Sequence, residues 1–163
     1  TAQIFSIVGH MHSNRINHGD IKPGNILIDK VGGIYFIDFG MSVFGNSPCN
    51  RVSELLYPYN PPELFTPYIK FSCDYYCDIW SAGVAVYEMM TGTIGKLAGI
   101  INSMDKESIL NQLYIHSNKS LTPDQKDFLS YILQPVADNR PTPYDILKHP
   151  YLLPIIEKYP KLL

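Results

Sequence analysis

The most informative stretch of this chain is residues 18–25, His-Gly-Asp-Ile-Lys-Pro-Gly-Asn, followed by an Asp-Phe-Gly that starts at Asp38. Phosphoryl transfer needs a base that orients the attacking hydroxyl, a cation beside the moving phosphoryl group and oxygen ligands for Mg²⁺. Asp20 matches the base and Lys22 matches the cation. Asn25 and Asp38 match the metal ligands. Any three-residue piece would be weak evidence, but the four side chains in this order indicate phosphate and metal chemistry.

Length and composition indicate one folded domain. The 163 residues are enough to bury about 70% of the unfolded surface. Hydrophobic residues make up 45% of the chain and charged residues 17%, which is typical of a globular protein and argues against disorder. The net charge of −2 gives no electrostatic reason to expect nucleic acid or a membrane as a partner. No apolar run approaches the roughly 18 residues of a membrane span, and no signal-peptide pattern opens the chain.

Cysteines and histidines offer no separate site. The three cysteines, Cys49, Cys73 and Cys77, have no CxxC spacing and no histidine near enough in sequence to suggest zinc. We therefore expect free thiols in a reducing compartment and an intracellular protein of the cytoplasm or nucleus. His10 and His12 are expected to be surface residues near a helix end, without a role.

The hydrophobic periodicity predicts a mainly helical domain with one small hairpin. The hairpin is expected from two apolar runs that flank Gly32-Gly33, and it places both motifs of the opening paragraph on loops at strand ends. Residues 41–67 show no period and are expected to form a long loop. A capping box at Thr122 and a similar pattern at Thr142 predict helix starts. The expected helices are 2–13, 78–90, 106–116, 122–133 and 142–149, and the expected strands are 26–28 and 34–37.

The motifs resemble the C-terminal (large) lobe of eukaryotic-type Ser/Thr protein kinases, with a His-Gly-Asp variant of the catalytic loop. Three further stretches carry the resemblance: Pro-Pro-Glu at 61–63, Asp-Ile-Trp-Ser-Ala-Gly at 78–83 and Arg-Pro-Thr at 140–142. Taken singly, each has a simpler explanation, such as a helix N-cap, a core aromatic, a turn acid or a surface charge. Their order and spacing favour the kinase interpretation, in which residues 1–163 are one kinase C-lobe.

The resemblance implies ATP and Mg²⁺ as cofactors and a protein Ser or Thr hydroxyl as substrate. It implies catalytic roles for Asp20 and Lys22. Nucleotide contacts would come from Lys22, Asn25, Leu27 and Asp38, and the metal ligands would be Asn25 and Asp38. It also implies several structural contacts: a Glu63–Arg140 ion pair, Asp78 accepting hydrogen bonds from the backbone near His18, a Phe39–His18 stack, and Leu27 with Met89 beneath the adenine ring.

The chain also departs from the family pattern. Gly19 stands where the family usually has an arginine that receives a phosphate, so we expect activity to be independent of phosphorylation between Gly40 and Pro61. Leu56 replaces a threonine that usually orients the catalytic acid, which predicts reduced activity.

No Gly-rich loop, strand lysine or helix glutamate of an N-terminal lobe is present in these residues. Since the chain starts at Thr1, we expect a piece of a longer kinase whose N-lobe lies in sequence not included here. The alternative is a stand-alone partial kinase, or a pseudokinase, that binds and regulates another kinase.

Overall fold

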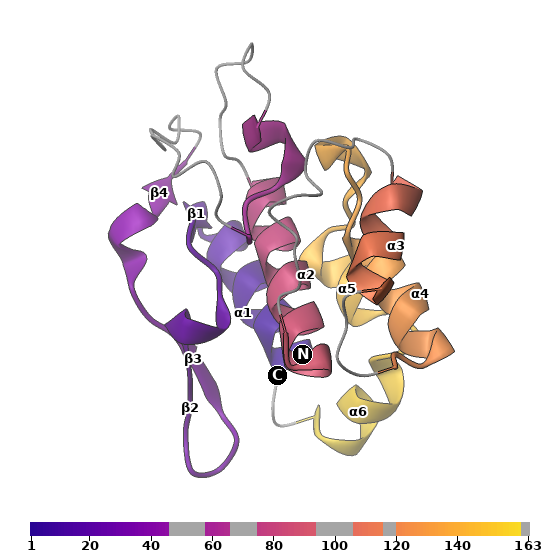
Figure 1. Cartoon of the computed structure of the whole chain (residues 1–163). Coiled ribbons are helices and arrows are strands. Elements are labelled where there is room, and N and C mark those ends of the chain that lie inside the picture. Colours follow the sequence, from indigo (N-terminus) through magenta and orange to yellow (C-terminus); the bar gives the residue numbers. More distant parts are fainter. Residues whose placement is uncertain (46–57, 66–74, 94–105, 116–119, 161–163) are drawn as a thin grey trace.

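The computed structural model describes residues 1–45, 58–65, 75–93, 106–115 and 120–160 (Figure 1). In that part the chain is mainly helical, as the periodicity predicts. The helices are α1 (Ala2–Ser13), α2 (Tyr75–Thr91), α3 (Lys106–Ile115), α4 (Pro123–Ile132), α5 (Pro143–Leu147) and α6 (Leu153–Lys158). The strands are β1 (Ile16–Asn17), β2 (Ile26–Ile28), β3 (Ile34–Phe36) and β4 (Val43–Phe44).

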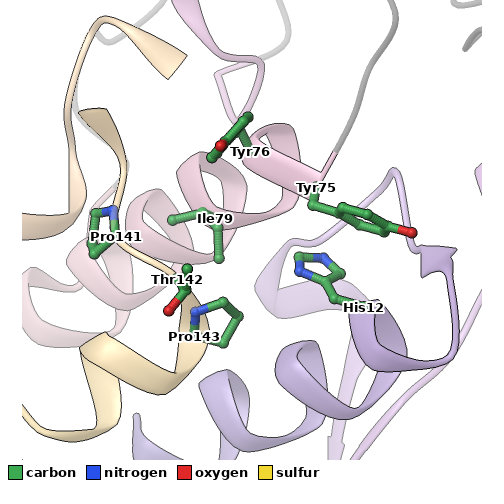
Figure 2. A pocket seen from close by; sticks show the side chains of 7 residues that line it. All are labelled: His12, Tyr75, Tyr76, Ile79, Pro141, Thr142 and Pro143. Carbon is green, nitrogen blue, oxygen red and sulfur yellow. The ribbon is translucent and has the colours of Figure 1, made fainter. Parts of the chain in front are cut away.

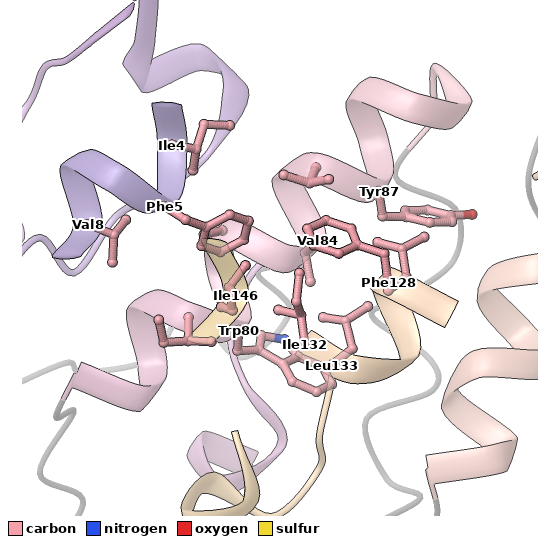
Figure 3. Packing of buried hydrophobic residues seen from close by; sticks show 14 of the residues in the cluster. Ile4, Phe5, Val8, Trp80, Val84, Tyr87, Phe128, Ile132, Leu133 and Ile146 are labelled. Carbon is pink, nitrogen blue, oxygen red and sulfur yellow. The ribbon is translucent and has the colours of Figure 1, made fainter. Parts of the chain in front are cut away.

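Helix α2 lies at the centre of the molecule, packed against α1 and α4 (Figure 1). Its residues are buried on all sides between Cys77 and Tyr87, which is typical of a core helix rather than an amphipathic surface helix. Phe5 of α1 meets Phe128 of α4 edge-on, with ring centroids 6.3 Å apart (Figure 3). A Cβ at Gly83 would lie 2.8 Å from side-chain atoms of Ile132 and Leu133. Glycine at this position therefore allows α2 to approach the end of α4 closely.

Two small antiparallel sheets lie beside the helices. β2 and β3 form the predicted hairpin, with Ile26 opposite Phe36. β1 pairs with β4, with Ile16 opposite Phe44. This second pair corrects the prediction that residues 41–67 are loop throughout, because β4 and a 3-10 turn at Pro62–Phe65 lie within that range. Both elements are too short to leave a periodic pattern.

Most predicted helix boundaries are confirmed to within a few residues. Thr122 Oγ1 accepts a hydrogen bond from Gln125 N at 3.2 Å, while Thr122 N donates to Gln125 Oε1 at 2.9 Å, so the capping box is confirmed. α2 starts three residues before the predicted Asp78, and Gly92 ends it with φ of +75°. α6 was not expected. Residues 46–57, which contain Cys49 and Leu56, and residues 66–74, which contain Cys73, lie outside the described part of the chain.

Among the described residues, no helix has the length and apolar character that crossing a bilayer requires. Cys77 is a free, buried thiol, as expected.

Candidate active site

The loop of residues 18–25, hereafter the Asp20 loop, gathers three of the predicted side chains around one carboxylate. Lys22 Nζ lies 2.8 Å from Asp20 Oδ2. Asn25 ends a 3-10 turn at Pro23–Asn25, and its Nδ2 donates to Asp20 Oδ2 at 2.8 Å and to Asp20 O at 2.9 Å. The side chain of Asp20 remains 16% exposed and that of Lys22 30% exposed. Lys22 and Asn25 thus hold the Asp20 carboxylate in place, while solvent still reaches it.

Asp38 lies on the neighbouring turn, hereafter the Asp38 turn (residues 38–41). Its backbone is left-handed, with φ of 63° and ψ of 71°, and its Oδ1 accepts a hydrogen bond from Gly40 N at 3.3 Å. Left-handed geometry at a residue other than glycine is strained and is often found at functional sites. Ile37 N donates to Asn25 O at 3.0 Å, so the residues that precede Asp38 and those that end the Asp20 loop are joined directly.

A ring contact also joins the Asp20 loop and the Asp38 turn. The His18 and Phe39 rings lie with centroids 4.8 Å apart and planes tilted by 47°, so the predicted contact is confirmed in a tilted arrangement. Ser42 Oγ donates to His18 O at 2.9 Å, a bond that sequence reasoning missed. Burial lowers the pKa of the His18 imidazole, and the nearby carboxylates of Asp78, Asp20 and Asp38, together with the Ile37 carbonyl, oppose the shift without reversing it.

Asp78, in the first turn of α2, fixes the start of the Asp20 loop. Its Oδ2 accepts from His18 N at 2.8 Å and its Oδ1 accepts from Gly19 N at 2.9 Å, as predicted. Gly19 has φ of +79°, a conformation that glycine adopts readily and an L residue does not. The glycine therefore suits the backbone that Asp78 holds in place.

His12 is the clearest correction to the sequence analysis. Instead of being a surface residue without a role, its side chain is only 10% exposed, and its Nε2 lies 3.1 Å from Asp78 Oδ2. The two residues are 66 positions apart, and no local pattern around His12 indicates the contact. A histidine in the last turn of a helix resembles an ordinary helix C-terminus until the fold places α2 beside it.

The predicted pair of Glu63 and Arg140 is confirmed. Arg140 donates through Nη2 to Glu63 Oε2 at 2.6 Å and through Nη1 to Glu63 Oε1 at 2.7 Å. The Arg140 side chain is fully buried and the Glu63 side chain is 19% exposed. Arg140 also donates to three backbone carbonyls and lies over the Trp80 ring, 5.1 Å from its centroid. The pair ties the 3-10 turn at Pro62–Phe65 to the segment between α4 and α5.

The two residues predicted to lie beneath the adenine ring are both at the surface. Leu27, on β2, and Met89, on α2, are 52% and 47% exposed, so both side chains are accessible at the surface.

Sequence reasoning missed the pair of Tyr59 and Glu88, in which the Tyr59 hydroxyl donates to Glu88 Oε2 at 2.5 Å. This bond links the segment before the Pro62–Phe65 turn to α2.

The oxygen donors of Asn25 and Asp38 fit a magnesium–phosphate group. Because Asn25 Nδ2 is directed at Asp20, its Oδ1 is the remaining end of the amide, and no hydrogen bond from the described residues reaches it. Asp38 is exposed. In the same described part, no three His, Cys, Asp or Glu side chains cluster to hold a metal by themselves. Such a site suits Mg²⁺, which usually takes one or two protein oxygens and completes its shell with water and substrate phosphates.

Comparison with known proteins agrees with this arrangement. The protein kinase domain family matches residues 1–152. The chain belongs to the protein kinase family. Sperm motility kinase Z of Mus musculus is 30% identical over 154 residues, which is 92% of this chain and 30% of that kinase. Serine/threonine-protein kinase par-4 of Caenorhabditis elegans is 29% identical over 151 residues, or 90% of this chain and 24% of that kinase.

A solved kinase structure has the same fold. The crystal structure of the Rad53 kinase domain and SCD2 in complex with AMPPNP matches with a TM-score of 0.63 and 25% identity. The match covers 93% of this kinase chain and 56% of the other. The chain therefore spans only part of the length of the relatives that it resembles.

Proposed function

We propose that this chain is the C-terminal lobe of a Ser/Thr protein kinase and transfers the γ-phosphoryl group of ATP to a protein hydroxyl once an N-terminal lobe completes the site. The observation that carries the proposal is the Asp20 carboxylate, with Lys22 Nζ and Asn25 Nδ2 each 2.8 Å from its Oδ2. A solvent-accessible carboxylate held beside a cation suits an acceptor for a hydroxyl proton.

Each polar residue has a distinct part in this proposal. Asp20 orients the substrate hydroxyl and accepts its proton. Lys22 places positive charge beside the transferred phosphoryl group, and Asn25 holds the Asp20 carboxylate through Nδ2. Asn25 Oδ1 and Asp38 would hold Mg²⁺, which, when bound, neutralises phosphate charge. Leu27 and Met89 offer an apolar surface for the adenine ring.

Exposed apolar surface near the site supports the proposal that an N-terminal lobe covers it. Many large apolar side chains of the hairpin, the Asp38 turn and β4 are exposed: Leu27, Ile28, Val31, Tyr35, Phe39, Met41 and Phe44. Exposed apolar groups in such number are typical of a surface that another domain or protein covers. An intracellular location, in cytoplasm or nucleus, is part of the proposal because ATP is the phosphoryl donor and Cys77 is a free thiol.

The same exposed surface favours one second candidate, a partial kinase or pseudokinase that binds another kinase through it. The coding sequence upstream of Thr1 distinguishes the two. The first proposal expects a Gly-rich strand-turn-strand and a strand lysine there. A start codon directly before Thr1 would favour the second.

The assigned roles can be tested by separating nucleotide binding from turnover in the complete kinase. Asp38→Ala should abolish the Mg²⁺-dependent part of ATP affinity, because the proposal makes Asp38 a charged metal ligand. Asp20→Ala should leave ATP affinity nearly unchanged and remove phosphoryl transfer, because Asp20 faces the hydroxyl. ATP titrations with and without Mg²⁺, paired with a radiolabelled transfer assay, measure both. Equal loss of affinity in the two variants would show that the roles are misassigned.

The 163-residue chain alone should give only background transfer, because half of the nucleotide contacts and the closing lobe are missing. Robust transfer by this chain that disappears in Asp20→Asn would refute the need for an N-lobe.

A further inference from the structure

A cavity of about 440 Å³ lies between the end of α1, the start of α2 and the residues that lead into α5 (Figure 2). Its volume falls within the roughly 300–1,000 Å³ that is usual for small-molecule sites. In Figure 2, His12 and Tyr75 lie on one side, Pro141 and Pro143 lie on the other, and Ile79 lies between them. None of its lining residues belongs to the Asp20 loop or the Asp38 turn, and His12 links it to Asp78.

The walls of the cavity are held by contacts of their own. Ile79 is buried in the core. Tyr76, at the same end of α2, is tied down because its carbonyl accepts from Arg140 Nη1 at 3.0 Å. Proline rings have few conformations, so Pro141 and Pro143 form a stiff wall. The cavity is therefore largely preformed, which reduces the entropy lost when a ligand binds.

His12 is a polar residue in the lining of the cavity. Its Nε2 faces Asp78 Oδ2 at 3.1 Å, and Asp78 already accepts two backbone N–H bonds, so the carboxylate is an acceptor and we assign the proton to Nε2. In neutral His12 the other nitrogen, Nδ1, then carries a lone pair. None of the contacts within the described segments gives Nδ1 a hydrogen bond. The imidazole thus offers an acceptor within an otherwise mostly apolar and aromatic site.

We propose that this cavity is a binding site for a small aromatic molecule that carries one N–H or O–H donor. The ring packs against Tyr75, whose own ring lies 4.6 Å from that of His12, and against the two prolines. The donor bonds to His12 Nδ1. Aromatic rings packed in offset or tilted arrangements gain more than the burial of their area alone.

A ligand here is coupled to the Asp20 loop through one atom. Asp78 Oδ2 accepts both from His12 and from His18 N, so a change at His12 alters the hydrogen bond that holds the loop. The regulatory consequence rests on the proposed kinase function, whereas the binding does not. Binding and transfer can therefore fail independently.

Indole and 1-methylindole form a matched pair of probes, because they share a ring system and only indole has an N–H donor. Titration of the full 163-residue chain, labelled with ¹⁵N-histidine, should show saturable binding of indole and a shift of the His12 Nδ1 signal. 1-Methylindole should bind about tenfold more weakly, the factor expected for a net hydrogen bond of about 1.4 kcal/mol. Equal affinities, or no saturable indole binding up to its solubility limit, would overturn the proposal.

Variants locate the site. Tyr75→Ala should weaken indole binding at least fivefold, and the matched control Tyr144→Ala, at an exposed tyrosine of α5, should leave it unchanged. His12→Lys keeps a donor for Asp78 and has no acceptor in place of Nδ1, so it should bind the two probes equally. Unchanged discrimination by His12→Lys would show that another group receives the indole N–H.

The coupling has its own readout. The backbone amide signals of His18 and Gly19 should shift with the same dissociation constant as indole binding. Saturable indole binding that leaves both signals unmoved would refute the link to the Asp20 loop. Because neither measurement uses phosphoryl transfer, both remain decisive if the chain proves to have no kinase activity.

Discussion

Replacing Glu63 by glutamine should destabilise the fold strongly, because it leaves a buried charge without its counter-charge. The Arg140 guanidinium is fully buried and donates two charge-assisted hydrogen bonds to Glu63, at 2.6 and 2.7 Å. Removing one partner of a buried ion pair typically costs about 3–5 kcal/mol. Two features place this pair near the lower end of that range: Glu63 is 19% exposed, and three backbone carbonyls still bind Arg140 in the variant.

An expected loss of about 3 kcal/mol corresponds to a fall in the unfolding midpoint of about 6–12 °C, since 1 kcal/mol shifts a domain of this size by about 2–4 °C. Trp80 is the single tryptophan of the chain and lies over the Arg140 guanidinium, so its fluorescence reports unfolding. Urea and thermal unfolding, followed by this signal and by circular dichroism, measure the change.

The matched control is Glu157→Gln, at an exposed glutamate of α6, which should change stability by less than about 0.5 kcal/mol. Arg140→Met removes the buried charge itself, so adding Glu63→Gln to it should cost much less than Glu63→Gln costs in the wild type. A loss below about 1 kcal/mol for Glu63→Gln, or full additivity with Arg140→Met, would refute the view that the orphaned charge dominates.

Three further outcomes are expected. Gly19→Ala should lower stability by about 1–2 kcal/mol because φ is +79° there. Gly24→Ala in the same loop should not, because a Cβ there would meet no atom within 4 Å; equal effects in urea unfolding would count against backbone strain. Burial lowers the pKa of His18 from its ordinary 6.5, so on acidification the unfolded chain binds a proton more readily than the folded chain. The free energy of unfolding should therefore be highest above pH 6.5 and fall as the pH is lowered. In His18→Phe this dependence on pH should flatten. Phosphatase treatment of the complete kinase should leave its activity within about tenfold (1.4 kcal/mol), since Gly19 has no side chain to receive a phosphate and the Ser42 hydroxyl already bonds to His18 O; a larger fall would mean that a phosphate orders the segment.

The features that were predictable from sequence have local or motif-based signals. The capping box at Thr122 is read from four adjacent residues, and the hairpin from two apolar runs around a glycine pair. The contacts of Asp78 with the Asp20 loop and of Glu63 with Arg140 join distant residues, and they were predictable only because each residue belongs to a recognisable kinase motif. Without the motifs, the local sequence would predict only a helix N-cap at Asp78 and surface charges at Glu63 and Arg140.

The features that were missed depend on tertiary packing. β1 and β4 have two residues each and exist because the fold places them side by side, so neither has a period of its own. α6 has six residues, too few to be stable in isolation, and forms in the context of the folded chain. The extension of α2 back to Tyr75 belongs to the same class. In each case the sequence permits the element but does not require it.

Asp78 shows why a motif can be recognised while its chemistry stays incomplete. The motif accounts for two of its hydrogen bonds, those from His18 N and Gly19 N. The third, with His12 Nε2 at 3.1 Å, comes from the last turn of α1, where no motif was recognised. This third bond extends the Asp20 loop's support to the wall of the cavity, because His12 belongs to both. Because Asp78 Oδ2 contacts both His12 Nε2 and His18 N, we expect a ligand in the cavity to shift the amide signals of the Asp20 loop.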